Sequence, residues 1–137
     1  MKRYEVIEHT ADAGIVAHGR DPGEAFANAA RGMFSLIADP PRGRTDFHRE
    51  VDLHAPDRET LLVDWLNELI FIFEVEHVIL SRFEVLDVGD KQLRARVRGH
   101  RIDPARHRLK SAVKAATYHS LRVEEEDGVS IRVIFDM

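Results

Sequence analysis

Two acidic segments at distant points of the sequence carry carboxylates that could do chemistry: the first would display Asp12 at a sheet edge, and the second could bind a cation. One is "EHTAD", which ends at Asp12, and the other is "VIFDM", in which Asp136 precedes Met137 and its main-chain carboxylate. The Asp136 side chain and the main-chain carboxylate of Met137 are close enough to repel one another, and burying them without a counter-charge is costly. A nearby lysine, or a hard cation such as Ca²⁺ or Mg²⁺, would neutralise them. The alternatives are a solvated chain end at Asp136 and, at Asp12, a turn in which Thr10 and Asp12 bond their own backbone.

A basic segment runs from Arg94 to Lys114, in contrast to the net charge of −4 of the whole chain. It holds eight lysines and arginines and two histidines against a single acid, Asp103. Such a segment suits RNA phosphates or an acidic protein surface, although its first, alternating arginines also fit a solvated sheet face. No aromatic residues are interspersed for base stacking, so we favour a protein contact over single-strand RNA binding. The residues assigned to this contact are Arg98, His100, Arg101, His107 and Lys110.

A third segment, "VKAATYH", contains a lysine among alanines. If this segment is a strand, Lys114, Ala116 and Tyr118 share one face. Burying an unpaired lysine is expensive, so carboxylates are its expected partners. His119 is interpreted as a structural histidine, because the histidines of the chain show no spacing typical of a zinc site.

The composition is that of an ordinary globular protein, which we expect to form one domain over residues 1–137. Apolar residues make up 44% and charged residues 32% of the chain, enough for a sizeable core. The lack of cysteine excludes disulfides, thiolate metal sites and cysteine nucleophiles. No segment approaches the roughly 20 apolar residues of a membrane span, and the N-terminus does not resemble a signal peptide. We therefore expect a cytoplasmic protein without a membrane or DNA partner.

Two segments have the periodicity of amphipathic helices. The first covers 21–38, with Asp21 as a candidate N-cap and Pro22 at the first helical position. The second begins after Pro56, with Asp57 as its cap. Each helix has its apolar residues on one side, so both are expected to cover one face of a sheet.

Alternating apolar and polar residues predict the strands of that sheet. Gly89 and Asp90 indicate a hairpin, and 111–126 is interpreted as extended, although its alanines leave a helix open. The predicted fold class is α+β, a two-layer sandwich in which a mixed β-sheet has two main helices packed on one face. The predicted strands are 3–9, 14–18, 46–54, 82–88, 92–100, 111–126 and 129–137.

Several segments together resemble the archease family, in the same order and over nearly the whole chain. The most specific are "EHTAD", "VKAATYH" and the terminal "FDM", where the family usually has "FDI"; "EAFANAARGMFSLIAD" and "LLVDWLNELIFIFEVE" add to the resemblance. The resemblance implies a non-catalytic protein, not an enzyme, that promotes guanylylation and multiple turnover of an RtcB-type RNA ligase. That ligase uses GTP and Mn²⁺ to join 3′-phosphate or 2′,3′-cyclic phosphate ends to 5′-hydroxyl ends. Contact with its RNA substrates, split tRNA or damaged RNA, would be indirect through the ligase.

The resemblance also implies which residues carry this function. The family's metal site corresponds to Asp12, Asp136 and the terminal residue Met137, with Ca²⁺ expected in the isolated protein and Mn²⁺ or Mg²⁺ as alternatives. Two departures, His100 and Ala112, replace acids that are usual in the family and bear on ligase docking. The ligase-activating residues implied by position are Asp12, Asp39, Lys114 and Asp136.

Two other functions compete with this one. A stand-alone hydrolase or phosphatase could use the same acids and a metal, but too few ligands are visible for a two-metal site. The sequence also has no phosphate-binding glycine loop, HExxH motif, EF-hand loop or nucleophile elbow. An RNA-binding or chaperone-like adaptor that modulates tRNA processing or methylation would use the segment from Arg94 to Lys114 and bind tRNA alone. The acidic net charge counts against this adaptor.

Overall fold

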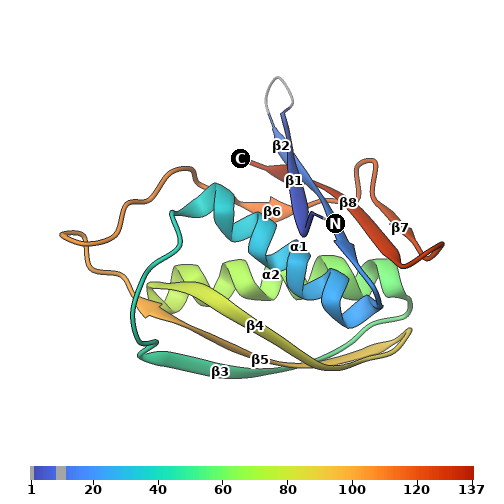
Figure 1. Cartoon of the computed structure of the whole chain (residues 1–137), viewed down its shortest axis with the longest axis horizontal. Helices are drawn as coiled ribbons and strands as arrows, with labels where there is room; N and C mark the ends of the chain where they lie inside the picture. The colour runs from blue at the N-terminus through green and yellow to red at the C-terminus, as the bar shows by residue number, and fades with distance from the viewer. Residues whose placement is uncertain (1, 9–11) are drawn as a thin grey trace.

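The computed structural model describes residues 2–8 and 12–137, which form two helices and two antiparallel sheets (Figure 1). The α+β class predicted from the sequence is therefore confirmed. The turn predicted at Thr10 lies outside the described residues. The helices are α1 (Pro22–Ile37) and α2 (Arg58–Glu76). The strands are β1 (Tyr4–Glu8), β2 (Ala13–Gly19), β3 (Phe47–His54), β4 (Val78–Val88), β5 (Gln92–Arg101), β6 (Ala115–Ala116), β7 (Arg122–Glu124) and β8 (Val129–Asp136).

Both helices begin at the caps predicted from the sequence. The Asp21 carboxylate accepts the N–H of Glu24 at 2.9 Å, and the Asp57 carboxylate accepts the N–H of Thr60 at 2.7 Å. Each bond satisfies a backbone donor that the first helical turn leaves without a partner. At the other end, α2 stops at His77, whose φ of 54° is left-handed.

The strands form two sheets, whereas the sequence predicted a single mixed sheet. In one sheet β1, β2, β8 and β6 are neighbours in that order, and β7 also pairs with β8. In the other the order is β3, β5, β4. All pairings between described strands are antiparallel. The prediction was wrong here because alternation indicates which side chains of a strand face the core, but not which strand is its partner.

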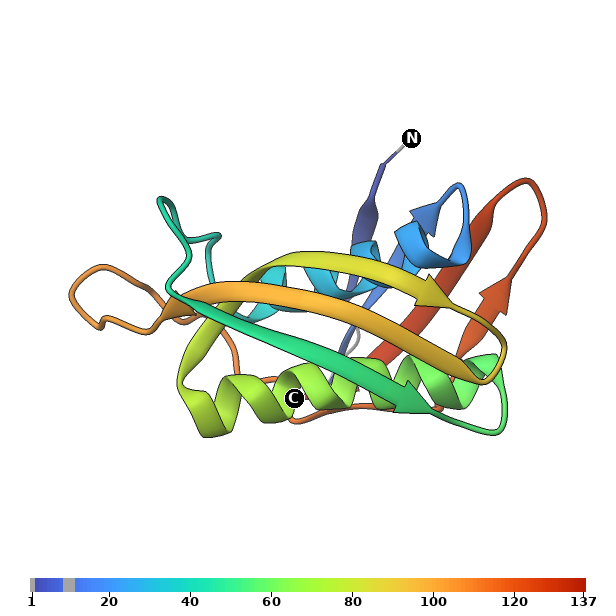
Figure 2. The same cartoon turned by 90° about the horizontal axis from the view of Figure 1, so that it is seen from below.

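The two helices lie between the two sheets, so the molecule has three layers and not the two predicted (Figures 1 and 2). Every residue of α1 from Ala25 to Ala30 is buried, so this helix is covered on more than one side. Small residues allow that close packing. A Cβ atom at Gly32 would lie 2.9 Å from Cδ1 of Ile15 and 3.1 Å from Cγ of Tyr4.

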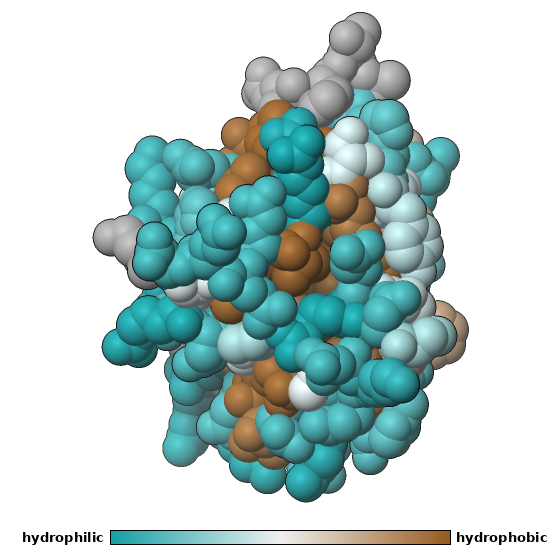
Figure 3. Space-filling view, turned by 90° about the vertical axis from the view of Figure 1, so that its right-hand side faces the viewer, coloured by the Kyte–Doolittle hydropathy of each residue, from teal (hydrophilic) through white to brown (hydrophobic). Residues whose placement is uncertain are grey.

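One hydrophobic core joins the layers, and polar residues predominate on the face where both helices begin. In the core, Nε1 of Trp65 on α2 donates to the carbonyl oxygen of Phe26 on α1 at 3.0 Å. On the face shown in Figure 3, hydrophobic residues appear in separate areas and not as one continuous patch. Within the described residues, neither helix has the length and apolar character needed to cross a membrane.

Candidate functional site

The antiparallel pairing of β2 with β8 brings the two acidic segments to the same end of a sheet. The last register pair is Ala13 opposite Phe135. Asp12 precedes Ala13 and Asp136 follows Phe135, so each acid lies one residue beyond this last pair. Asp136 is exposed and Asp12 is partly exposed. The side chain of Met137 packs against the hydrophobic core, and this contact holds the chain in place after Asp136.

Lys114 reaches the same sheet end through its main chain. Its N–H donates to the carbonyl oxygen of Asp136 at 2.8 Å, and the next residue, Ala115, is the register partner of Asp136. The Lys114 side chain is exposed. It takes part in none of the ion pairs formed among residues 2–8 and 12–137. The structure therefore brings Asp12, Asp136 and Lys114 together; we call these three residues the acidic edge.

The segment around Lys114 is not the long strand predicted over 111–126. Only the short strands β6 and β7 form there. Of the three residues that would share a face in such a strand, Lys114, Ala116 and Tyr118, only Ala116 lies in a strand, and it is buried whereas the other two are exposed. The N–H of Ala116 donates to Oδ1 of Asn67 on α2 at 2.7 Å. This contact joins β6 to α2, and no local sequence pattern predicts it.

Asp39 follows α1 and lies beside Lys110. The two side chains approach to 3.5 Å between Nζ and Oδ1. Lys110 also donates from Nζ to the carbonyl oxygen of Ser35 at 3.0 Å and from its main chain to that of Ile37 at 2.7 Å. Lys110 thus fastens its loop to the end of α1, and this loop leads on to Lys114. Asp39 is linked to the acidic edge along that loop.

His100 is buried, with 7% of its surface exposed, whereas the other four residues predicted to contact a partner are exposed or partly exposed. Its Nε2 lies 3.2 Å from the carbonyl oxygen of Gly43, so we assign the proton to this nitrogen. Its Nδ1 has no hydrogen-bond partner among the described residues. The ring of His107 lies 6.3 Å away between centroids, and its Nδ1 accepts the N–H of Asp103 at 2.9 Å. His100 therefore holds internal structure and offers little surface to a partner.

The two arginines of this predicted contact lie on β5. The main-chain N–H of Arg101 donates to Oδ1 of Asp46 at 2.8 Å. The guanidinium carbon of Arg101 lies 5.8 Å from the ring centre of Phe47, within the range of a cation–π contact. Arg98 is exposed and lines a hollow together with residues of β4, among them Arg82.

The donor atoms at the acidic edge suit a hard cation but do not complete its coordination. Asp12, Asp136 and the main chain of Met137 offer oxygen atoms, which Ca²⁺ and Mg²⁺ prefer. Among the residues that the structure describes, no three His, Asp or Glu side chains gather closely enough to hold a metal ion. Because Ca²⁺ takes roughly six to eight oxygen ligands, water or groups of a partner would have to fill the remaining positions.

Sequence reasoning did not single out Arg3, Asn28 and Arg31, which line a hollow of about 560 Å³ beside α1. One signal was available: Asn28, which is 3% exposed, is a polar residue in an otherwise apolar buried run. The approach of Arg3 to Arg31 depends on how β1 packs against α1. That packing has no signature in the local sequence.

The whole described chain has counterparts among known proteins. The family described as Archease protein family (MTH1598/TM1083) matches residues 4–137. The protein archease of Methanosarcina mazei is 40% identical over 131 residues, which cover 93% of this chain and 90% of the relative. The protein archease of Methanothermobacter thermautotrophicus is 38% identical, with both chains covered in full. The solution structure of protein 1598 of Methanobacterium thermoautotrophicum has a TM-score of 0.84 and 35% identity over 100% of both chains.

Proposed function

This chain belongs to the archease family, and from that premise we propose that it is a non-catalytic activator of an RtcB-type RNA ligase. It promotes guanylylation of the ligase and so allows multiple turnover. The reaction it supports joins 3′-phosphate and 5′-hydroxyl RNA ends in tRNA splicing or RNA repair. We place this activity in the cytoplasm.

The observation that carries the proposal is the placement of Asp12, Lys114 and Asp136 at one end of a sheet. The main-chain hydrogen bond of 2.8 Å from Lys114 to Asp136 holds these two residues side by side. Both side chains are exposed, and neither is neutralised by an ion pair within the described residues. Charged groups that a sheet presents in fixed positions are suited to meet complementary charges in the active site of another protein.

We further propose that Asp12, Asp136 and the main-chain carboxylate of Met137 bind a divalent cation. Ca²⁺ is expected in the isolated protein, with Mn²⁺ or Mg²⁺ as alternatives. Bound there, the cation would neutralise the carboxylates that meet where β2 begins and β8 ends. Calorimetric titration should show binding by the wild type and none by Asp136→Ala with its fold intact. Equal affinity in the two proteins would contradict the assignment of this ligand.

RNA ligation with a limiting amount of the cognate ligase tests the activator function. We expect the wild type to convert a single turnover into many, and Asp136→Ala and Lys114→Ala to leave about one turnover. Glu126→Ala and Lys91→Ala are matched controls, because both side chains are exposed and form no hydrogen bond or ion pair within residues 2–8 and 12–137. They should activate like the wild type.

The outcomes separate the function from the site. If the wild type does not stimulate ligation, the proposed function is wrong. If it does and both Asp136→Ala and Lys114→Ala remain active, the function stands but the acidic edge is not its site.

A further inference from the structure

A basic groove runs between the start of the chain, α1 and β4, away from the β2–β8 strand ends. Three adjoining hollows, of about 560, 260 and 470 Å³, share the same three lining residues: Arg3, Arg31 and Phe83. The third hollow adds Arg82 and Arg98. We call the surface lined by Arg3, Arg31, Arg82 and Arg98, with Phe83 at its floor, the arginine groove.

The acids of the arginine groove are already paired, so its remaining positive charge is not compensated. Glu24 lies 3.1 Å from Arg20, and Glu84 lies 3.4 Å from Arg96. No ion pair formed within residues 2–8 and 12–137 includes the four arginines that define the groove. Like charges crowded on one surface are costly unless an anion binds there.

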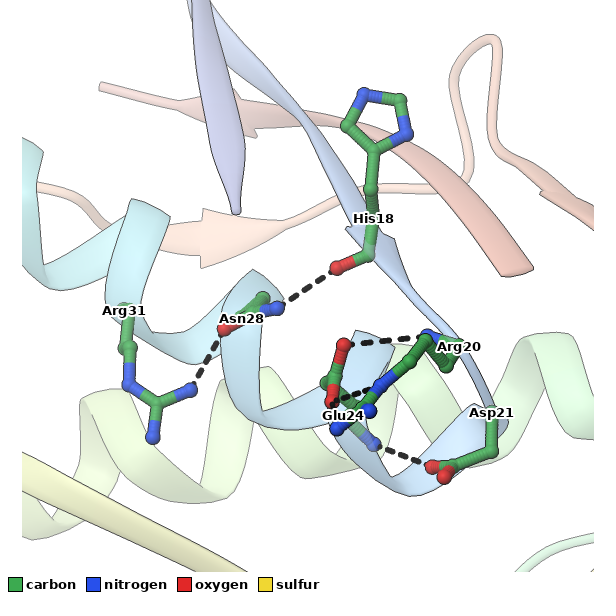
Figure 4. Close-up of polar contacts among 6 residues, drawn as sticks. All are labelled: His18, Arg20, Asp21, Glu24, Asn28 and Arg31. Atoms are coloured by element: carbon green, nitrogen blue, oxygen red, sulfur yellow. Dashed lines mark hydrogen bonds and ion pairs between the residues drawn. The ribbon is translucent and has the colours of Figure 1, made fainter. Parts of the chain in front are cut away.

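Arg31 is held in place by a buried polar residue. Asn28 is 3% exposed, and its Nδ2 donates to the carbonyl oxygen of His18 at 2.7 Å. That bond orients the amide so that Oδ1 accepts Nη1 of Arg31 at 2.6 Å. Figure 4 shows Asn28 between His18 and Arg31, while Arg20 lies against Glu24 near the start of α1. Because a buried amide orients the guanidinium group of Arg31, this side chain is held in one position and does not move freely at the surface.

The electrostatic environment of Arg31 favours an anion. Burial lowers the pKa of Arg31, the positive charge of Arg3 lowers it further, and Glu24 offsets part of this effect. Gly32 packs closely against Tyr4. Arg31 precedes Gly32 and Arg3 precedes Tyr4, so this packing brings the two arginines near each other. A phosphate between two guanidinium groups would remove their repulsion and accept charge-assisted hydrogen bonds from both.

The shape of the arginine groove favours a chain of phosphates over a single one. Three hollows in contact offer several arginines along one path. The aromatic residue they share, Phe83, is 5% exposed and cannot stack against bases. Contacts would therefore go to the backbone and not to the bases, which predicts binding without sequence preference.

We propose that the arginine groove binds the phosphodiester backbone of RNA. The phosphate chemistry follows from the groove itself, and the choice of RNA rests on the proposed ligase function. The protein would then hold an RNA strand directly, on a surface distinct from the acidic edge.

Fluorescence anisotropy with a labelled single-stranded oligouridylate and the full chain alone, without ligase, tests this proposal. We expect Arg31→Ala and Arg3→Ala each to weaken binding about tenfold. The slope of log affinity against log salt should be roughly −2 for three neutralised phosphates of a single strand. Arg3→Ala guards against loss of folding in Arg31→Ala, because the Arg3 side chain is exposed and forms no hydrogen bond or ion pair with the residues that the structure describes. Arg122→Ala on β7 is the matched control and should bind like the wild type.

Competition with other phosphate compounds identifies the kind of ligand that binds, and further arginine variants identify the surface that binds it. Stronger competition by GTP or pyrophosphate than by unlabelled RNA would overturn the backbone proposal in favour of a small phosphate ligand. Loss of binding in Arg106→Ala with Arg108→Ala, but not in Arg31→Ala, would move the site to the loop before Lys110 and overturn it. Asp136→Ala should bind RNA like the wild type, so failure of RNA binding and failure of ligase activation are distinguishable.

Discussion

A single carboxylate, that of Asp57, determines where α2 begins. Its hydrogen bond from the main chain of Thr60 lowers the pKa of Asp57. Because the folded pKa is depressed, this stabilisation is present above the unfolded pKa and is lost as pH falls through the folded pKa. We expect Asp57→Ala to lower Tm by about a few degrees at neutral pH. The difference from the wild type should shrink in acid, as circular dichroism melts at both pH values would show.

The matched control for this cap is Asp57→Asn. An asparagine keeps an oxygen that can accept the Thr60 N–H but carries no charge. Its Tm should stay close to that of the wild type at neutral pH. A melting curve of Asp57→Ala that coincides with the wild type at neutral pH would show that the cap does not stabilise α2.

At the scale of elements, Asn67 on α2 anchors the segment that presents Lys114. Its Oδ1 accepts the N–H of Ala116 at 2.7 Å, which ties β6 to α2. We expect Asn67→Ala to destabilise the fold by about 1 kcal/mol and to speed amide hydrogen exchange at Ala116. Asn67→Asp, which keeps an acceptor oxygen, should exchange more slowly than Asn67→Ala. Equal exchange rates at Ala116 in wild type and Asn67→Ala would contradict this anchoring role.

The packing of α1 against β1 and β2 depends on the missing side chain at Gly32. A methyl group there would approach Ile15 to 2.9 Å, closer than carbon atoms normally pack. Gly32→Ala should therefore lower the free energy of unfolding by about 1–3 kcal/mol. Gly23→Ala on the same helix is the matched control, because the added Cβ would lie 3.4 Å from its nearest neighbour, Oδ1 of Asp21. Urea unfolding curves that show no loss for Gly32→Ala would mean that α1 can shift without cost.

The sequence predicted those features that depend on neighbouring residues. The caps at Asp21 and Asp57, the last strand, which ends one residue before the predicted 137, and the hairpin through Gly89 all follow local chemistry and are present. The β4 strand starts at Val78 and not at residue 82, because the buried run 78–80 follows the helix directly. Nothing local indicates that β3, β4 and β5 leave the other strands to form a sheet of their own.

The candidate site shows the same division. The acids at its two ends were recognisable as residues, but their meeting depends on the register of β2 against β8, which places Ala13 opposite Phe135. The resemblance to a family implied what these acids do, and the register of β2 against β8 determines where they lie. The arginine groove had no family motif, and its four arginines come from four separate places in the sequence.

At the scale of the whole molecule, the net charge of −4 conceals two surfaces of different character. The acidic edge presents carboxylates and one lysine at the ends of β2 and β8. The arginine groove, between α1 and β4, presents guanidinium groups without paired acids in the described part of the chain. A partner enzyme and an RNA strand could bind at the same time, because the two surfaces share no residue.

This separation predicts that the two surfaces can be inactivated independently. In the proposed function, labelled GTP and ligase without RNA isolate the guanylylation step from RNA binding. There, Asp136→Ala should fail and Arg31→Ala should match the wild type. In ligation, Arg31→Ala should raise the RNA concentration for half-maximal rate several-fold while kcat changes little, because it removes binding that ground state and transition state share. If Arg31→Ala fails in guanylylation without RNA, the arginine groove contacts the ligase itself, and the assignment of RNA to it is wrong.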